Sequence, residues 1–424
     1  MPQSRGPAAK SKLPPRVFPR RFACENRKGK PFLKITKVDV YQLGTDVRPD
    51  WRPVVCRVFT DEGIYGDGEA AMAYDMGAPG AFGCLKDFAT MVIGMNPLDN
   101  EVIWDKLYRG TFWAQNGGPV TFAAISALDI AMWDIKGKYF GVPVYQLLGG
   151  KKRDDLRCYA SQLQFGWGEV RTPARAPEDY VRWAQKAVGE GYDAIKIDFF
   201  IYDEDHGFFG DNDRLGLLSR KYLNLYEKRL SAVREAIGPD VDIIIENHSY
   251  TDAQSGLQIA RIAEKYGAFC FEEPTTPYPK ITQYFGVRTS LPIATGERIY
   301  SRWQYAQYFE QNAIQLIQPD IGNCGGLTEA KKICDMAYTY DVGVQCHACG
   351  SPLANVAALQ LEAVIPNFVI HEHHAVNLTP YNKAYCIHDW QPVHGRFKIP
   401  DLPGLGNEFA PEALAQATAQ ATVR

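Results

Sequence analysis

The sequence lacks the features of several large classes of protein. It holds no run of eighteen or more apolar residues, which is about the length that a membrane-spanning helix needs. Its formal net charge is only −3, and basic residues are in clear excess only within residues 1–30, where nine Lys or Arg stand against Glu25. A nucleic-acid partner would require a clustered basic surface. We therefore expect neither a membrane partner nor a nucleic-acid partner.

The sequence also lacks the marks of a secreted protein. Ten cysteines are spread from Cys24 to Cys386 without the compact spacing of a disulfide framework, and residues 1–30 lack the apolar core of a secretory signal. Scattered thiols are typical of a large enzyme in a reducing compartment, so we expect a cytoplasmic protein. Residues 1–30 are expected to form a basic, Pro-rich arm; a transit peptide is the alternative, because the stretch is rich in Arg and poor in acidic residues.

Residues 31–150 have the pattern of an α+β lobe. Alternating apolar positions in KITKVDVYQL and VVCRVFTDEGIYGDGEA predict a small antiparallel sheet, with turns at glycines that include Gly66 and Gly68. Apolar residues three or four positions apart in VTFAAISALDIAMWDIKGKYFG predict an amphipathic helix, which Gly137 and Gly141 are expected to break.

The repeated element after residue 150 is a short apolar strand that turns polar at its C-terminal end. It recurs in DIIIENH, FCFEEP, IATGER, IQLIQPD, VGVQCHA and FVIHEHH, whose polar markers lie at positions 246, 272, 297, 320, 347 and 372. Successive markers are 23 to 27 residues apart, which is about the length of one strand and one helix with their loops. We therefore predict an α/β fold in which a (β/α)8 TIM barrel over residues 151–385 follows the α+β lobe.

One interval in this barrel is about twice as long as the others. Lys196, at the end of the strand DAIKIDFF, lies 50 residues before Glu246 (246 − 196 = 50). The extra residues 201–220 are expected to form either a lid over the mouth of the barrel or a solvated surface insertion.

Three consecutive strands end in a carboxylate. Because the C-terminal ends of barrel strands meet at one rim, Glu246, Glu272 and Glu297 should converge there. Converging carboxylates repel one another unless a hard cation lies between them, and all-oxygen ligation favours Mg²⁺. A surface glutamate or a salt bridge is the alternative for any one of the three.

The next strands end in Asp320, His347 and Glu372. An aspartate that accepts a hydrogen bond from an imidazole fixes its tautomer and raises its basicity, so His347 is a candidate general base. Glu372 is expected either to orient a hydroxyl or carboxylate of the substrate or to pair with a lysine.

Together these segments resemble the mandelate racemase branch of the enolase superfamily. The most specific pieces are AIKID, the EEP of FCFEEP, the GER of IATGER, QPDIGNCGG and SALDIAMWDIKGK, and the likeness extends from about residue 31 to the end. The resemblance implies that the N-terminal lobe caps the barrel and that the three glutamates bind magnesium. It also implies that Asp320 and His347 form a proton-transfer dyad and that Glu372 contacts the substrate.

The resemblance also bears on which loops contact the variable end of the substrate and on whether the chain assembles into oligomers. Cap loops near Trp51 and Tyr74 should touch the substrate, and Arg298 is a further candidate contact. We expect residues 386–424 to pack back on the capping lobe, and the chain to form a homo-oligomer as similar proteins often do.

Two departures from the family pattern narrow the reaction. Racemising members carry two lysines spaced by one residue on the second strand, whereas this chain has Lys196 and Asp198, which favours chemistry on one face of the substrate. Lys196 would add positive charge beside the substrate carboxylate. His248, two residues after the ligand Glu246, is similar to the histidine that protonates the departing hydroxide in galactonate and mannonate dehydratases.

We therefore predict a magnesium-dependent lyase that dehydrates a sugar acid, either an aldonate or an aldarate. His347 would remove the C2 proton and His248 would protonate the C3 hydroxyl, giving a 2-keto-3-deoxy acid. The nearest alternative is a cycloisomerase or epimerase in which Asp198 is the base on the second face.

Two alternatives lie outside this chemistry. A zinc hydrolase would use His371 and His373 or the cysteines of CHAC, although His371 and His373 should point away from the face of Glu372. A non-catalytic barrel should lack a ligand or the base, and none is missing from this sequence.

Overall fold

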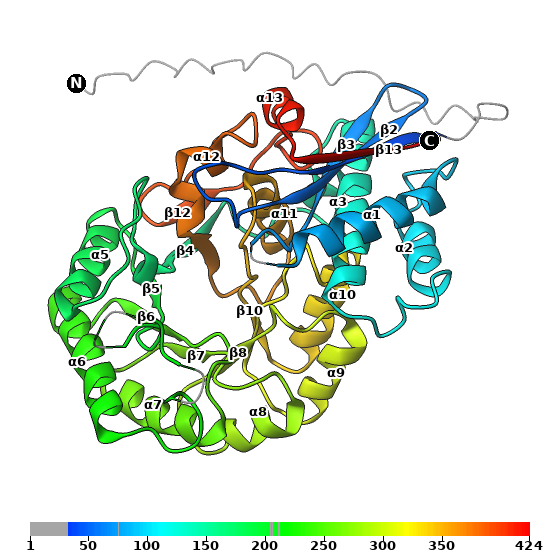
Figure 1. The fold of residues 1–424 in the computed structure, drawn as a ribbon. Coiled ribbons are helices and arrows are strands. Elements are labelled where there is room, and N and C mark those ends of the chain that lie inside the picture. The colour runs from blue at the N-terminus through cyan, green and yellow to red at the C-terminus, as the bar shows by residue number, and fades with distance from the viewer. Residues whose placement is uncertain (1–32, 75, 204, 206, 211–212) are drawn as a thin grey trace, which may run out of the picture. The chain divides into compact units, whose positions relative to one another are not determined.

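The computed structural model describes residues 33–424 except residues 75, 204, 206 and 211–212 (Figure 1). The predicted basic arm, residues 1–30, lies outside the described residues.

The N-terminal lobe contains a four-stranded antiparallel sheet with helices packed against it. The strand order is β13-β1-β2-β3, with β1 at Ile35–Gln42, β2 at Val54–Thr60, β3 at Tyr65–Ala70 and β13 at Ala419–Val423. The helices are α1 (Ala78–Val92), α2 (Asn100–Arg109) and α3 (Pro119–Phe140). The C-terminal end of the chain therefore completes the sheet of the lobe, with Val423 opposite Val38 (Figure 1).

The prediction that α3 is amphipathic is wrong, because side chains on nearly its whole circumference are buried. It lies between β3 and the barrel helix α10 (Gly326–Thr339), so both of its faces are covered. It also runs through Gly137 and ends at Gly141, which has the left-handed φ of 69°. The sequence pattern showed one apolar stripe and gave no sign that a second element covers the opposite side.

Gly66 and Gly68 also differ from expectation, because they lie within β3 rather than in turns. A Cβ at Gly66 would lie 2.2 Å from the Ala131 carbonyl oxygen, and one at Gly68 would lie 1.9 Å from that of Ala127. The two glycines allow α3 to approach the strand closely.

The second part of the chain confirms the predicted barrel of parallel strands. The sheet order is β10-β9-β8-β7-β6-β5-β4-β11, and each neighbouring pair is parallel. A parallel bridge between Val344 and Phe368 joins the two edges. The strands are β4 (Asp155–Ser161), β5 (Ala194–Ile197), β6 (Asp242–Glu246), β7 (Cys270–Glu272), β8 (Ile293–Thr295), β9 (Leu316–Ile317), β10 (Gly343–Val344) and β11 (His371–His374).

The outer layer departs from the ideal (β/α)8 pattern after the last strand. Within the described residues seven helices connect the eight strands: α5 (Pro177–Gly189), α6 (Arg220–Ile237), α7 (Ala253–Lys265), α8 (Pro279–Gly286), α9 (Arg302–Glu310), α10 and α11 (Pro352–Glu362). After β11 the chain forms a 3-10 turn (Ala375–Leu378) and the short α12 (Pro380–Lys383). It then returns along β12 (Arg396–Lys398) and α13 (Pro411–Ala415) to the lobe, which takes the place of an eighth outer helix.

A buried polar network joins the lobe to the barrel. Asp129 of α3 accepts hydrogen bonds from the backbone N–H of Thr328 at 2.9 Å and from its hydroxyl at 2.5 Å. The Ser126 hydroxyl accepts from the N–H groups of Gly325 and Gly326, at 2.9 and 3.0 Å. These bonds satisfy backbone groups at the start of α10 and so fix the position of the lobe.

The predictions about membrane spans and about cysteines can be compared with the described residues. No helix in the described part of the chain is long and apolar enough to cross a membrane. The nine cysteines that the structure describes are all free thiols, and most of them are buried.

Candidate active site

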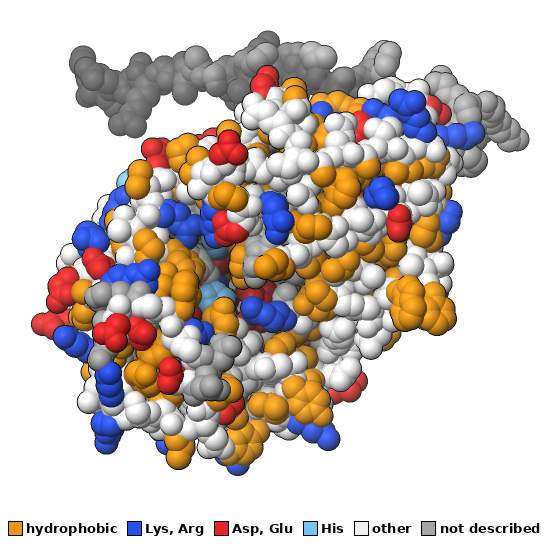
Figure 2. Space-filling view, in the orientation of Figure 1, with side chains coloured by type: hydrophobic (Ala, Val, Ile, Leu, Met, Phe, Trp, Pro, Cys, Tyr) orange, Lys and Arg blue, Asp and Glu red, His pale blue; other side chains and the backbone are white. Residues whose placement is uncertain are grey.

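A cavity of about 350 Å³ lies at the C-terminal ends of the barrel strands, beneath loops of the lobe. Barrel residues His248, Glu297 and His347 line it, and Trp51 and Tyr74 line it from the lobe. Figure 2 shows histidine side chains in this hollow, with basic side chains on its border. A larger hollow of about 750 Å³, lined by residues that include Gln42 and Tyr385, holds none of the predicted site residues.

Lys196 is buried in the barrel and is surrounded by carboxylates. Its Nζ lies 3.0 Å from Glu246 Oε1, 2.8 Å from Glu272 Oε1 and 2.9 Å from Glu372 Oε1. Burial lowers the pKa of Lys196, but the charges of the three glutamates outweigh it and raise the pKa well above its usual value. Lys196 is therefore a fixed internal cation.

Glu246 and Glu272 are neighbours across the strand pair β6 and β7. Glu246 Oε1 also accepts a hydrogen bond from Gln162 Nε2 at 2.7 Å. Glu272 Oε2 is buried and has no hydrogen-bond partner among the described residues. Burial and the charges of nearby glutamates raise the pKa of Glu272 to about 7, although the charge of Lys196 opposes this shift.

The third predicted ligand, Glu297, contacts Arg298 and His347. Arg298 Nη1 lies 2.5 Å from Glu297 Oε1, and His347 Nε2 lies 3.2 Å from Glu297 Oε2. Lys196 thus lies between Glu246 and Glu272, whereas Arg298 pairs with Glu297. No group of three acidic, His or Cys side chains within the described ranges is placed to hold a metal ion.

The residues nevertheless have the chemistry that a hard divalent cation requires. All three predicted ligands are carboxylates at one rim, and one buried oxygen of Glu272 has no partner in the described chain. A buried oxygen without a partner is costly, and an oxygen-preferring cation would satisfy it. The donor set therefore fits Mg²⁺.

His347 and Asp320 form the predicted pair. His347 Nδ1 lies 2.7 Å from Asp320 Oδ2, which leaves Nε2 on the side of Glu297. Burial lowers the pKa of His347, but Glu297 and the hydrogen bond to Asp320 outweigh it and raise the pKa to about 10. The geometry gives the imidazole a fixed orientation and a high proton affinity.

A second pair, which the sequence did not predict, joins His248 to Asp198. His248 Nδ1 lies 3.3 Å from Asp198 Oδ2, and its Nε2 lies 3.3 Å from Glu246 Oε1. Burial lowers the pKa of His248, whereas Glu246 and Asp198 raise it to about 9. His248 has a positive φ of 49°, an uncommon backbone conformation for this residue that directs its ring toward the site.

Only some of the residues predicted to contact the substrate line the cavity. Glu372 is fully buried, accepts hydrogen bonds from the Ser161 hydroxyl at 2.6 Å and the Ala348 N–H at 2.9 Å, and does not line the cavity. Trp51 and Tyr74 line the cavity and are joined by an antiparallel bridge. Arg298 pairs with Glu297 and with Glu273, so its charge is already balanced.

Several polar residues at the site were missed by sequence reasoning. Gln162 and Gln164 both donate to Glu246, and they follow the first barrel strand, so the strand-end rule applied to β4 would have found them. Arg48 and Arg171 line the cavity from loops, where no spacing marks them.

Two residues of the segment 201–220, Ile201 and Phe208, belong to the lining of the cavity. This placement favours the lid over the solvated insertion.

The histidines of the zinc alternative point away from the site. His371 Nδ1 lies 2.5 Å from Glu362 Oε2, and its Nε2 lies 2.9 Å from Asn355 Oδ1. His373 Nδ1 lies 2.6 Å from the Tyr192 hydroxyl. Both rings are held by these buried partners and do not line the active-site cavity.

Comparison with known proteins agrees with this architecture. Residues 36–149 match the family described as "Mandelate racemase / muconate lactonizing enzyme, N-terminal domain", and residues 179–413 match "Enolase C-terminal domain-like". A D-galactonate dehydratase of Pectobacterium atrosepticum is 32% identical over 92% of this chain and 95% of its own length.

Two solved structures extend the likeness to three dimensions. A member of the enolase superfamily from Salmonella Typhimurium is 46% identical, with a TM-score of 0.90 over 93% of this chain and all of that chain. The 3,6-anhydro-D-galactonate cycloisomerase of Zobellia galactanivorans is 27% identical, with a TM-score of 0.77 over 91% of this chain and 99% of that chain. The chain therefore belongs to the mandelate racemase and muconate lactonizing enzyme family of the enolase superfamily.

Proposed function

We propose that this protein is a magnesium-dependent hydro-lyase that converts a sugar acid into a 2-keto-3-deoxy acid. The observation that carries the proposal is the pair of histidines, His347 and His248, which line one cavity and each contact an aspartate. The relatives named D-galactonate dehydratase, which match over nearly their whole length, support a dehydration.

The first step removes the proton next to the carboxylate of the substrate. His347 Nε2 takes this proton from C2, while Asp320 holds the N–H of Nδ1 and stabilises the imidazolium. Glu246, Glu272 and Glu297 are the residues that would hold Mg²⁺. When bound, the ion supplies a Lewis acid that lowers the free energy of the doubly charged enediolate.

The second step removes the hydroxyl group at C3. His248 donates its proton to this hydroxyl, the C3–O bond breaks, and the electron pair left on C2 forms the double bond. Water and an enol are the products, and the enol becomes the keto-acid by moving one proton from oxygen to C3. Asp198 holds His248 in position through Nδ1.

The two histidines can be distinguished by experiment. His347→Asn should abolish both dehydration and the exchange of the C2 proton with deuterated water, because no base remains. His248→Asn should slow dehydration roughly 10²- to 10⁴-fold and leave the exchange of the C2 proton unchanged, because only the general acid is lost. Full turnover by both variants would contradict the assignment.

The metal is tested by exhaustive chelation. Activity should fall to background, return with Mg²⁺, and be accompanied by a rise in Tm on adding Mg²⁺ to the apoprotein, since a ligand that binds only the folded state stabilises it. Full activity after chelation would exclude the proposed ion.

A cycloisomerase is a second candidate, because the His248–Asp198 pair supplies a second proton-transfer group in the same cavity. The likeness to a 3,6-anhydro-D-galactonate cycloisomerase supports it. Incubation in heavy water separates the two: a dehydratase releases keto-acid, whereas a cycloisomerase or epimerase returns an isomer of unchanged mass apart from deuterium. A homo-oligomer and a cytoplasmic location remain proposals.

A further inference from the structure

Two arginines from different parts of the chain lie at one side of the active-site cavity. Arg48 follows β1 in the capping lobe, and Arg171 follows β4 in the barrel. Both line the active-site cavity, and both also line an adjoining outer cavity of about 480 Å³. The mechanism described above uses neither of them.

The positive charge of this arginine pair is only partly balanced. Arg48 Nε lies 3.3 Å from the carboxylate of Asp50, which is half exposed and also lines the cavity. No carboxylate in the described part of the chain pairs with Arg171, and its Nε is buried without a hydrogen-bond partner there. Burial and the charge of Arg48 lower the pKa of Arg171, although the Tyr381 hydroxyl hydrogen-bonds to it. A partly buried cation with a buried N–H group that has no partner is stabilised by an anion.

His374 adds a neutral donor to the same lining. Its Nδ1 accepts the backbone N–H of Val376 at 3.0 Å, so the ring proton is on Nε2. Burial lowers the pKa of His374 well below its usual value, and the charge of Arg171 lowers it further. The ring is therefore a hydrogen-bond donor that carries no charge.

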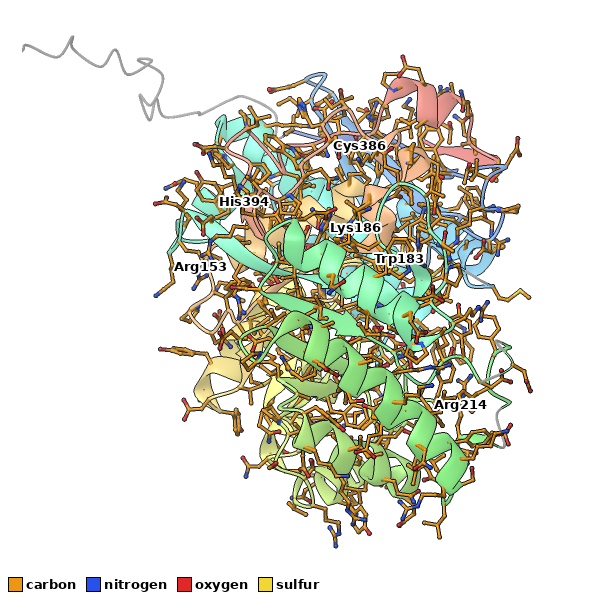
Figure 3. The ribbon with its side chains drawn as sticks, turned by 90° about the vertical axis from the view of Figure 1, so that its left-hand side faces the viewer. Arg153, Trp183, Lys186, Arg214, Cys386 and His394 are labelled. Carbon is orange, nitrogen blue, oxygen red and sulfur yellow. The ribbon has the colours of Figure 1, made fainter. Side chains whose placement is uncertain are left out.

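The loop that carries Arg171 is held in place by α5. Lys186 Nζ donates to the Trp167 carbonyl at 2.9 Å, and Trp183 Nε1 donates to the Thr172 carbonyl at 3.0 Å. Figure 3 shows Lys186 and Trp183 on this outer helix, beside α6. A binding group on a tethered loop needs less ordering when a ligand arrives.

We propose that Arg48 and Arg171 bind a second anionic group at the end of the substrate remote from the reacting carboxylate. This inference rests on the proposed function and makes the substrate a dianionic sugar acid, such as an aldarate, rather than a monocarboxylate. The reacting carboxylate is assigned to the side of Glu297 and His347, where the ion would bind. Arg171 follows β4, which lies four strands from β8 in the barrel order and so across the mouth of the barrel from Glu297. Arg48 shares both cavities with Arg171, so we assign the two arginines to the other end.

The test compares substrates that differ only at the terminal carbon. A hexarate, the hexonate with the same configuration at C2 to C5, and the 6-phosphate of that hexonate are assayed for keto-acid formation. A kcat/KM for the hexarate at least about tenfold above that for the hexonate supports a terminal carboxylate. A preference for the phosphate ester also supports the second anion and assigns it as phosphate.

Substitutions of the two arginines test whether these side chains cause the preference for a dianionic substrate. Arg171→Met and Arg48→Met should each lower kcat/KM for the preferred dianion roughly 10- to 100-fold and change that for the hexonate less than about threefold. Arg182→Met is the matched control, because Arg182 lies on α5 with a half-exposed side chain that pairs with Asp179. It should leave all three substrates unchanged.

Two results would overturn the inference: equal kcat/KM for hexarate, hexonate and phosphate ester, or an equal loss with every substrate in the arginine variants. If none of the acids is dehydrated, the proposed function fails instead. The inference is then decided by equilibrium binding of hexarate and hexonate to the wild type and to Arg171→Met. Tighter binding of the hexarate that the variant loses supports it, and equal binding refutes it.

Discussion

At the scale of single residues, Asp198 gives a prediction, because the structure shows it as the partner of His248 rather than as a free base. Asp198→Asn should lower the rate of dehydration about 10- to 100-fold and leave C2 proton exchange unchanged, since the imidazole of His248 loses its orienting carboxylate. Asp193→Asn, at the opposite end of the same strand, is the control and should change neither rate. An equal loss of exchange in Asp198→Asn would instead indicate a base on the second face.

The ends of the barrel strands made most of the site residues predictable. Glu246, Glu272 and Glu297, with Asp320 and His347, follow from one rule, because parallel barrel strands bring their C-terminal ends to one rim. The partners of these residues could not be predicted in the same way. Lys196 contacts carboxylates on three different strands, and such contacts depend on side-chain packing across the barrel.

Arg48 and Arg171 mark the limit of sequence reasoning at this scale. Both lie on loops, and the path of a loop depends on tertiary contacts such as those from Trp183 and Lys186. No periodic pattern identifies a loop residue that faces a cavity.

At the scale of elements, the strand period predicted the barrel, whereas the contacts of α3 were not predictable. Apolar spacing reports one buried stripe, but α3 is covered on one side by β3 and on the other by α10. Glycine in a strand is usually attributed to a turn, and only the packed structure shows that Gly66 and Gly68 lie against backbone carbonyls.

The close contact between β3 and α3 predicts a large difference in stability between two glycine substitutions. Gly68→Ala should reduce the free energy of unfolding by at least about 1–3 kcal/mol, because the new methyl group meets the Ala127 backbone. Gly83→Ala in α1 meets no atom within 4 Å and should stabilise the helix by up to about 1 kcal/mol. Urea denaturation of both variants measures the difference, and equal midpoints would show that the strand and helix can move apart freely.

At the scale of the whole molecule, the capping lobe and the barrel are joined through buried carboxylates. Asp129 of α3 accepts its hydrogen bonds from the start of α10. Burial raises the pKa of Asp129 to about 7, although the bonds from Thr328 lower it in part. The same cause raises the pKa of Glu69 to about 7.

The sign of the resulting pH dependence follows from linkage. A carboxyl whose pKa is raised on folding stabilises the folded state below its unfolded pKa, near 4, and this stability is lost as the pH rises through about 7. Asp129→Asn should therefore reduce the fall in Tm between about pH 5.5 and about pH 8. Asp105→Asn, on the exposed face of α2, is the control and should keep the wild-type slope. An unchanged slope in Asp129→Asn would show that this carboxyl is already ionised at low pH.

The position of Lys196 among buried carboxylates has a consequence for folding. Because this side chain already lies among Glu246, Glu272 and Glu372, the folded barrel contains its own counter-ion. Folding therefore does not require an inorganic ion to balance these carboxylates, and binding of the proposed metal would be a separate, later event.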